Sequence, residues 1–161
     1  MNILVVSDTH GRWGALYNVI QAHPDAEAVI HLGDGHDDLE RVRPQFPGLV
    51  MVGVAGNCDF LAPSGVPGTA VIELGGKKIF YTHGHNYRVK SGESFVEQAA
   101  RARGADICLY GHTHIPCTDV RGGMYIMNPG SVGHPRDGRP TCGIITIDGE
   151  DISISVEQCS L

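Results

Sequence analysis

The sequence predicts an α/β protein in which helices cover β-sheet, and three features of the chain carry this prediction. The first third alternates short apolar runs with segments of helical periodicity, which is typical of a sheet with covered faces. The middle holds two β-rich runs joined by Gly75-Gly76, which is a hairpin signal. The last third adds further apolar runs, with turns expected at Gly122-Gly123 and Asp148-Gly149.

The first third of the chain is expected to supply three strands and two helices. Strands are expected over Asn2 to Ser7, Ala26 to Leu32 and Leu49 to Val54, because these runs are short and apolar. Helices are predicted from about Arg12 to Ala22 and from Asp37 to Val42. The apolar face of the first helix consists of Leu16, Val19 and Ile20.

The middle and last thirds are expected to be richer in strands. The two hairpin arms are predicted over Thr69 to Leu74 and Lys77 to Thr82, and a helix follows over about Ser91 to Arg103. The buried stripe of that helix is predicted to consist of Phe95, Val96 and Ala99. Further strands are expected over Asp106 to Tyr110, Cys117 to Val120, Met124 to Met127, Cys142 to Ile147 and Ile152 to Val156.

Length and composition limit the class of protein. The 161 residues suit one compact domain over 1–161, and 42% hydrophobic with 19% charged residues is ordinary for a globular chain. The formal net charge of −6 argues against a general nucleic-acid binder, which would show a basic face. No stretch approaches the roughly 20 apolar residues of a membrane span, so no membrane association is expected.

The five cysteines are odd in number, and their spacing indicates no disulfide framework. We expect free thiols in a reducing cytoplasm, because the N-terminal segment MNILVVSDTH lacks the basic start and long apolar core of a signal peptide. No CxxC pair occurs, so the spacing disfavours a structural zinc protein. The sequence leaves the oligomeric state open.

Polar residues gather where the expected strands end. In an α/β sheet, ligands bind beyond the carboxyl ends of strands, so such residues are expected at one edge. Alone, a histidine or a Gly-Asp pair is weak evidence, and His23 and His31 are interpreted as ordinary core or loop residues. Together, the segments predict a metal or catalytic site. The segments are Asp8-Thr9-His10, Gly33-Asp34, Gly56-Asn57-Cys58-Asp59, Thr82-His83-Gly84-His85 and Gly111-His112-Thr113-His114.

The donor types in these segments favour a particular chemistry. Imidazole and carboxylate together bind Mn, Fe, Zn or Ni. Asp-x-His and His-x-His spacings place both side chains on the same side of an extended segment, where they can hold one ion or two adjacent ions. Two divalent cations against the carboxylates of Asp8 and Asp34 leave a net charge of about +2, or about +1 with a bridging hydroxide. Such a site attracts an anionic ester and activates water near neutral pH.

These motifs resemble the calcineurin-like metallophosphoesterase superfamily, and more closely its small bacterial and archaeal phosphodiesterases that lack a cap domain. The resemblance rests on SDTHG, HLGD, GNCD, THGH, YGHTH and NPGS, in that order over nearly the whole chain. It implies a sandwich of two mixed β-sheets flanked by helices, with which the strand and helix order above is compatible. It also implies a metal-dependent hydrolase of small phosphate esters, with diesters preferred.

The resemblance further implies two divalent metal ions, with Mn²⁺ expected ahead of Zn²⁺, Fe²⁺ or Ni²⁺. A bridging water or hydroxide would attack phosphorus in line, and Asn128-Pro129-Gly130-Ser131 would form a supporting turn. We assign catalytic roles to Asp34, Asn57 and His85. The implied metal ligands are Asp8, His10 and His114 for one ion, Asn57, His83 and His112 for the other, and Asp34 as the bridge.

One position departs from the wider superfamily. Many members carry a histidine after Gly-Asn, where it contacts the phosphate and can protonate the leaving group, whereas this chain has Cys58. A thiol beside two cations tends to ionise, which makes it a poor proton donor. His85 and His36 are the candidates for the acid or for supporting a metal ligand, and His36 fits a solvated turn equally well.

A second class of function stays open in the sequence. The same fold serves mainly as a protein-interaction scaffold in the retromer subunit Vps29, in which a metal site would be vestigial. A scaffold can lose metal-binding histidines, whereas this chain keeps all seven expected positions, which favours an enzyme. The sequence leaves open the natural substrate, the choice between diester and monoester, and the native metal.

Overall fold

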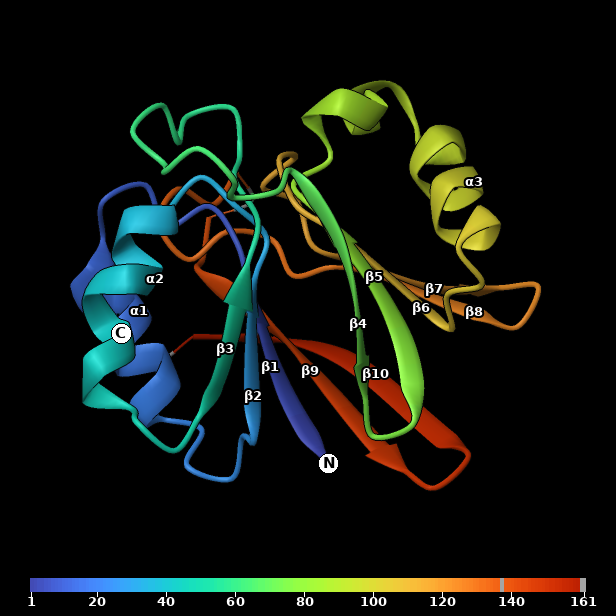
Figure 1. Cartoon of the computed structure of the whole chain (residues 1–161), viewed down its shortest axis with the longest axis horizontal. Coiled ribbons are helices and arrows are strands. Elements are labelled where there is room, and N and C mark those ends of the chain that lie inside the picture. Colours follow the sequence, from blue (N-terminus) through green and yellow to red (C-terminus); the bar gives the residue numbers. More distant parts are fainter. Residues whose placement is uncertain (137, 160–161) are drawn as a thin grey trace.

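The computed structural model describes residues 1–136 and 138–159, which form two β-sheets with helices on their outer faces (Figure 1). The first sheet contains β1 (Asn2–Val6), β2 (Ala28–His31), β3 (Val50–Gly53), β9 (Thr141–Asp148) and β10 (Asp151–Gln158). The second contains β4 (Thr69–Leu74), β5 (Lys77–Thr82), β6 (Ile107–Tyr110), β7 (Cys117–Arg121) and β8 (Met124–Asn128). The strand orders are β10-β9-β1-β2-β3 and β4-β5-β6-β8-β7.

Both sheets are mixed, as the resemblance implied. In the first, β1, β2 and β3 run parallel, while β9 is antiparallel to both β1 and β10. In the second, β5, β6 and β8 run parallel, while β4 and β7 are antiparallel edge strands. The predicted hairpin joins β4 to β5, and Gly75 and Gly76 adopt φ values of 58° and 75°, as a tight hairpin turn requires.

The core between the two sheets follows from the alternation of side chains along each strand. In β1, Ile3 and Val5 point toward the second sheet and pack in a cluster with residues such as Ile79 and Leu109. Their neighbours Leu4 and Val6 point the other way, toward the helices. Because both faces of β1 are covered, the strand is apolar from Ile3 to Val6, which is typical of buried parallel strands.

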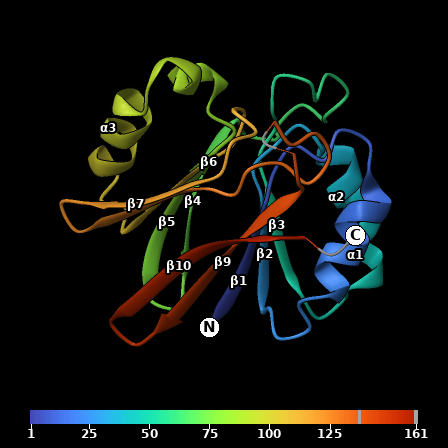
Figure 2. The same ribbon diagram turned by 180° about the vertical axis from the view of Figure 1, so that it is seen from behind.

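Helices α1 (Trp13–Gln21) and α2 (His36–Val42) cover the outer face of the first sheet (Figures 1 and 2). The predicted face of α1 is confirmed, since Leu16, Val19 and Ile20 are all buried. A short 3₁₀ turn, η1 (Arg43–Gln45), continues the chain beyond α2. Among the described residues, no helix has both the length and the apolar character needed to cross a bilayer.

Helix α3 (Ser94–Ala102) covers the second sheet, and here the sequence prediction was wrong in two respects. Val96 and Ala100 form the buried stripe, while Phe95 is 56% exposed, because a shift of one residue turns a side chain by about 100° around a helix. The helix also begins later than predicted. Two 3₁₀ turns, η2 (His85–Tyr87) and η3 (Val89–Ser91), precede it, and Gly92 with a φ of 138° interrupts the helical path.

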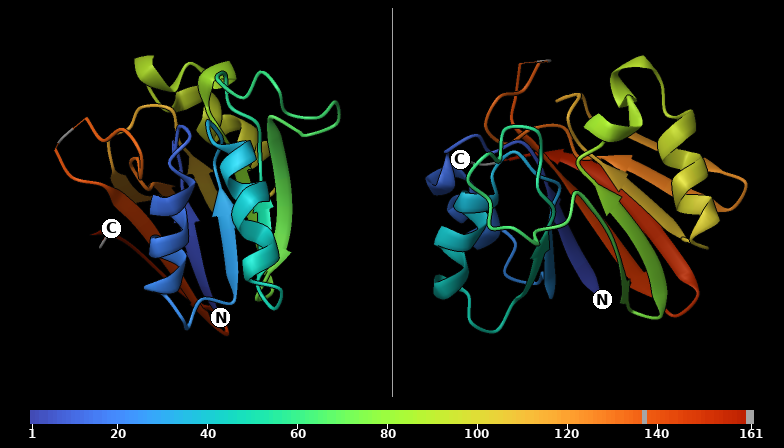
Figure 3. Two further views of the ribbon diagram at one scale, coloured as in Figure 1. Left: turned by 90° about the vertical axis from the view of Figure 1, so that its left-hand side faces the viewer. Right: turned by 45° about the horizontal axis from the view of Figure 1, so that its top comes forward.

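The loops that follow β1, β2, β3, β5 and β6 meet at one rim of the sandwich, at the top of Figure 1 and turned forward in the right panel of Figure 3. Parallel strands within each sheet bring their carboxyl ends to the same edge, and the packing of the two sheets brings both edges together. The fold therefore places all five predicted polar segments on one surface.

Candidate metal centre

The seven predicted ligand residues come from five loops and converge at this rim. Asp8 and His10 follow β1, Asp34 follows β2, and Asn57 follows β3. His83 directly follows β5, and His112 and His114 follow β6.

The first donor cluster is formed by Asp8, His10 and His114, whose ligand atoms lie within 4.8 Å of one another. The Nε2 atom of His114 lies 3.0 Å from Oδ1 of Asp8, and the Nε2 atom of His10 lies 3.7 Å from the same oxygen. The two Nε2 atoms are 3.4 Å apart. Asp8 is fully buried, whereas both imidazoles remain partly exposed, so the cluster opens to solvent on one side.

The second donor cluster is formed by Asp34, His83 and His112, again with ligand atoms within 4.8 Å of one another. The Nε2 atom of His83 lies 3.1 Å from Nδ1 of His112 and 3.1 Å from Oδ1 of Asn57. The amide oxygen of Asn57 thus joins this cluster.

Asp34 lies between the two clusters. Its Oδ2 atom is 3.4 Å from Nε2 of His83 and 3.8 Å from Nε2 of His10. Its other oxygen, Oδ1, accepts a hydrogen bond of 2.7 Å from the backbone N–H of Cys58, which fixes the orientation of the carboxylate. One carboxylate therefore faces donors of both clusters.

The backbone at the rim adopts an uncommon conformation. Few residues other than glycine adopt positive φ, and such residues concentrate at functional sites. Here the left-handed conformation turns each side chain out of its strand direction and toward the site. Within residues 1–136 and 138–159, the residues other than glycine with positive φ are Asp8, His10, Asp34, Arg88, His112 and His114, so five of these six are predicted ligands.

Two glycines allow the loops to approach each other closely. A Cβ atom on Gly56 would lie 2.1 Å from Oδ1 of Asp34, and one on Gly111 would lie 2.1 Å from Oγ of Ser7 and 3.1 Å from Oδ2 of Asp8. Any side chain at these positions would displace the carboxylates that the site presents.

The imidazoles are oriented so that unshared electron pairs point into the site. The Nδ1 atom of His83 lies 2.8 Å from the carbonyl oxygen of Leu32, and that of His114 lies 2.6 Å from the carbonyl oxygen of His134. A carbonyl only accepts, so each Nδ1 carries the proton and each Nε2 of the neutral ring is left as a donor of electrons. This is how histidine is commonly held when it binds a metal.

The donor arrangement fits a cation on two further grounds. The unshared electron pair on Nε2 of a neutral His83 faces two further acceptor atoms, Asn57 Oδ1 and His112 Nδ1. These electron pairs repel one another unless a proton or a cation lies between the atoms. Asp8 Oδ1 is buried and has no hydrogen-bond partner among the described residues. A buried anionic oxygen without a hydrogen bond is costly unless a positive charge lies beside it.

The ionisation of the carboxylates reflects the same crowding. Burial alone would raise the pKa of Asp8, but the imidazoles of His10, His114 and His83 hold that pKa far below its usual range. Burial also acts to raise the pKa of Asp34, but His83 and the Cys58 N–H outweigh burial and lower that pKa to about 2. Burial and the charge of His83 lower the pKa of His112 to about 4. Both carboxylates are therefore ionised at neutral pH.

Asp59 organises the loops around Asp34, a role that the sequence did not reveal. Its carboxylate accepts hydrogen bonds from four backbone N–H groups, at 2.8 Å from Asp34, 2.9 Å from Gly35, 3.0 Å from His36 and 2.7 Å from Gly56. The one feature of the sequence that could have indicated this role is the position of Asp59 at the end of the GNCD motif.

The NPGS turn supports the first cluster, in agreement with the resemblance. The Asn128 amide donates to the carbonyl oxygen of Gly111 at 3.1 Å and to Oγ1 of Thr113 at 2.9 Å, which holds the loop of both His112 and His114. The Ser131 hydroxyl donates to the Asp8 carbonyl oxygen at 2.9 Å.

The remaining candidates lie around the donors. His85 stands beside His83, with ring centroids 5.3 Å apart. His36 is buried at the start of α2, and its Nδ1, like that of His85, has no hydrogen-bond partner among the described residues. His31 is fully buried, as interpreted, and burial lowers its pKa to about 4.

A cavity of about 400 Å³ adjoins the centre. Its lining includes His10, Asp34, Cys58 and Asp37. It also includes His134, which the sequence analysis did not single out and whose ring stacks on His10 at 4.8 Å with an interplanar angle of 16°. The cavity gives a small ligand access to both donor clusters.

The fold and the two clusters together define a protein of the metallophosphoesterase type. The chain belongs to the calcineurin-like phosphoesterase superfamily, whose domain matches residues 1–150. It is 32% identical to the probable metallophosphoesterase YsnB of Bacillus subtilis (strain 168), over 96% of this chain and 89% of that protein. It is 28% identical to the phosphodiesterase YfcE of Escherichia coli (strain K12), over 87% of this chain and 84% of that protein.

Solved structures show the same fold. A predicted phosphoesterase from Streptococcus pneumoniae TIGR4 has a TM-score of 0.82 and 32% identity, covering 98% of this chain and 88% of its own. Vps29 complexed with Zn²⁺ from Entamoeba histolytica has a TM-score of 0.76 and 23% identity, covering 98% of both chains. At that identity, the likeness to Vps29 concerns the fold alone.

Proposed function

We propose that this protein is a metal-dependent phosphodiesterase whose site holds two divalent ions. Asp8, His10 and His114 would bind one ion. Asn57, His83 and His112 would bind the other, and Asp34 would contact both. The observation that carries the proposal is the position of Asp34 Oδ2, within 3.4 Å of His83 Nε2 and 3.8 Å of His10 Nε2, where donors from both clusters face one another.

Paired divalent ions in phosphatases and nucleases stabilise the attacking and leaving oxygens and lower the pKa of water toward about 7. The protein's own contribution is to fix the donors before substrate arrives. Asp59 and the Cys58 N–H hold the Asp34 loop and carboxylate, and the carbonyl of Leu32 holds the His83 ring. A rigid set of donors avoids reorganisation during the reaction, which is the main source of electrostatic catalysis.

The substrate enters by the open side of the centre. The side chains of His10 and His114 are 18% and 15% exposed, and the adjoining cavity of about 400 Å³ suits a small phosphate ester. His85 stands on the side of the second cluster, where we assign it a catalytic role in contacting substrate. Phosphodiesters are the preferred substrate class, because the relative YfcE is named as a phosphodiesterase.

Mn²⁺ is the first assignment for the metal, with Zn²⁺, Fe²⁺ and Ni²⁺ as alternatives, because the donors are imidazole, carboxylate and amide oxygen rather than thiolate. A cytoplasmic location remains a prediction from the five free thiols. The alternative function is a Vps29-like interaction scaffold with a vestigial site, and the convergence of all seven donors favours the enzyme.

The test is elemental analysis of the purified protein together with hydrolysis of bis(p-nitrophenyl) phosphate in the presence of each candidate metal. The proposal expects about two Mn²⁺ ions per chain after loading with Mn²⁺, and metal-dependent turnover. Full loading with no hydrolysis of any aryl phosphodiester would favour the scaffold, and a protein that binds no divalent ion would overturn the assignment of the donors.

A further inference from the structure

A second group of metal-binding side chains lies away from the rim, on the outer face of the first sheet. His23, Cys142 and Glu157 each offer one ligand atom, and these atoms all lie within 4.8 Å of one another. His23 follows α1, Cys142 lies in β9 and Glu157 lies in β10. The group shares no residue with the centre described above, and 134 positions separate His23 from Glu157.

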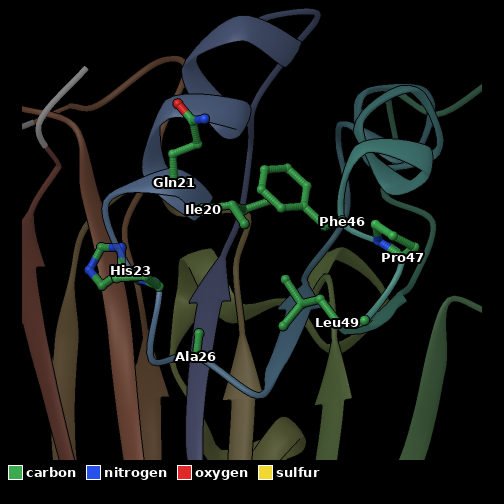
Figure 4. Close-up of a pocket in the computed structure, with 9 residues that line it drawn as sticks. Ile20, Gln21, His23, Ala26, Phe46, Pro47 and Leu49 are labelled. Carbon is green, nitrogen blue, oxygen red and sulfur yellow. The ribbon is translucent and has the colours of Figure 1, made fainter.

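His23 is held in the way that metal-binding histidines are held. Its Nδ1 atom lies 2.7 Å from the carbonyl oxygen of Val19, so Nδ1 carries the proton. Its side chain is only 15% exposed. Figure 4 shows its ring turned away from Phe46 and Leu49, which line an apolar pocket of about 450 Å³, and toward the neighbouring strands.

The other nitrogen of His23 requires a positive charge. Nε2 lies 2.7 Å from Oε1 of Glu157, and a neutral ring protonated at Nδ1 has no proton to donate to this oxygen. Two acceptors at this distance repel each other, so a second proton or a cation must act between them. Burial opposes the charged ring, but the Val19 carbonyl and Glu157 outweigh it and raise the His23 pKa.

Cys142 supplies the thiol of this group, and a second thiol, Cys159, lies next to it. Cys142 is fully buried and pairs directly opposite Glu157 in the antiparallel ladder of β9 and β10. Cys159 is two residues beyond Glu157, so its side chain falls on the same face and packs against the same cluster as Cys142. The Cys142 and Cys159 thiols are in contact with each other.

We propose that His23, Cys142 and Glu157, with Cys159 as the fourth donor, form a separate site for one Zn²⁺ ion. The donor set of imidazole, carboxylate and two thiolates is one that zinc accepts in tetrahedral sites, with ligand bonds of about 2.0–2.3 Å. Four protein donors leave no open position, so the site is structural. It ties the end of β10 to α1, which approach each other in Figure 2.

The experiment replaces Zn²⁺ with Co²⁺, because a thiolate bound to Co²⁺ gives a charge-transfer absorption that imidazole and carboxylate do not give. The full chain is kept reduced so that Cys142 and Cys159 remain thiols. The wild-type protein should show this absorption. The Cys58→Ser variant, which lacks the thiol beside the rim, should show it as well. The absorption should fall several-fold in both Cys142→Ser and His23→Gln.

Zinc content gives a second measurement on the same variants. Cys142→Ser and His23→Gln should each lose about one Zn²⁺ per chain while keeping hydrolysis of an aryl phosphodiester within about twofold of wild type. If Cys142→Ser fails to fold, Glu157→Gln tests the same site, since that side chain is 51% exposed. A reduced wild type without thiolate absorption would overturn the proposal, as would absorption that disappears with Cys58→Ser and persists in Cys142→Ser. These outcomes do not depend on whether the rim is a phosphodiesterase.

Discussion

The Oδ2 atom of Asp34 lies 3.4 Å from the Nε2 atom of His83, at the point where the two donor clusters meet. The side chain of His83 is fully buried and that of Asp34 is only 3% exposed, so neither can move away into solvent. Their separation is longer than a strong hydrogen bond and leaves space for an ion to contact both.

Asp34→Asn should remove activity and lower the Mn²⁺ content of the Mn²⁺-loaded protein to below one ion per chain, because the amide supplies only one oxygen and no charge. Inductively coupled plasma analysis and an aryl phosphodiester assay measure the two effects. Asp37→Asn is the matched control, since Asp37 is an exposed carboxylate that lines the same cavity but belongs to neither cluster. A variant Asp34→Asn with two ions and normal turnover would show that Asp34 does not bridge them.

Removal of metal should destabilise the fold. Asp8 and Asp34 repel each other without cations, and a ligand that binds only the folded state stabilises it by about 2.7 kcal/mol at 100 times its Kd. For a domain of this size that corresponds to a fall in Tm of about 5–10 °C on chelation, restored by Mn²⁺. Differential scanning fluorimetry measures it. The Asp34→Asn variant should respond much less, and an unchanged Tm after verified metal removal would contradict a shared site.

The stabilisation by Mn²⁺ should be larger at about pH 8 than at about pH 6. Burial acts to lower the His83 pKa, but the contact with the Asp34 carboxylate and the charge of Asp8 outweigh it and raise that pKa in the protein without metal. A raised histidine pKa stabilises the folded state below about pH 6.5, and this contribution is lost as pH rises through the raised value.

Protons and metal therefore compete for the His83 ring, since only the neutral imidazole binds an ion. Tm values with chelator and with Mn²⁺ at both pH values test the effect. The expectation fails if Mn²⁺ raises Tm by more at the lower pH.

Asp59→Asn should weaken metal binding, although Asp59 belongs to neither of the two donor clusters. The Asp59 carboxylate accepts hydrogen bonds from four backbone N–H groups. In Asp59→Asn, the side-chain NH₂ group is a donor and would face some of these donors without accepting from them. Loss of a group that positions a ligand typically costs 10–100-fold in metal affinity. Titration of the metal-free protein with Mn²⁺ measures this, with Asp37→Asn again as the control. Equal affinities for Asp59→Asn and wild type would contradict a positioning role.

Activity should fall steeply as the pKa of the leaving group rises. The family resemblance leads us to expect a histidine at the position of Cys58, and general acid catalysis contributes about 10²–10⁴-fold. The Cys58 thiol is exposed, and burial together with the carboxylates of Asp34 and Asp59 raises its pKa in the protein without metal, whereas two cations would act in the opposite direction. Esters of nitrophenol need the missing acid least.

A series of diesters graded by leaving-group pKa tests this on wild type, Cys58→Ser and Cys58→His. Cys58→Ser should change aryl ester hydrolysis by less than about twofold, while Cys58→His should help alkyl esters selectively if the imidazole reaches the leaving oxygen. A flat series for wild type combined with a large loss in Cys58→Ser would assign acid catalysis to Cys58 or its surroundings.

Local patterns in the sequence determined the strands, the Gly75-Gly76 hairpin and the five polar segments, because the alternation of side chains and the φ preferences of glycine depend on neighbouring residues only. The family resemblance that these segments carry indicated all seven residues of the candidate centre. It misplaced the buried face of α3 at Phe95, because the side of a short helix that is buried depends on the sheet against which it packs.

Only the tertiary structure decided which donors face one another. Asp34 meets His83 because the two sheets pack with their strand ends at a common rim, and no local pattern encodes that packing. The same tertiary packing brings four N–H donors to Asp59 and stacks the ring of His134 on that of His10. His23 meets Glu157 because β9 lies between β1 and β10, an order that arises from contacts between residues far apart in the chain.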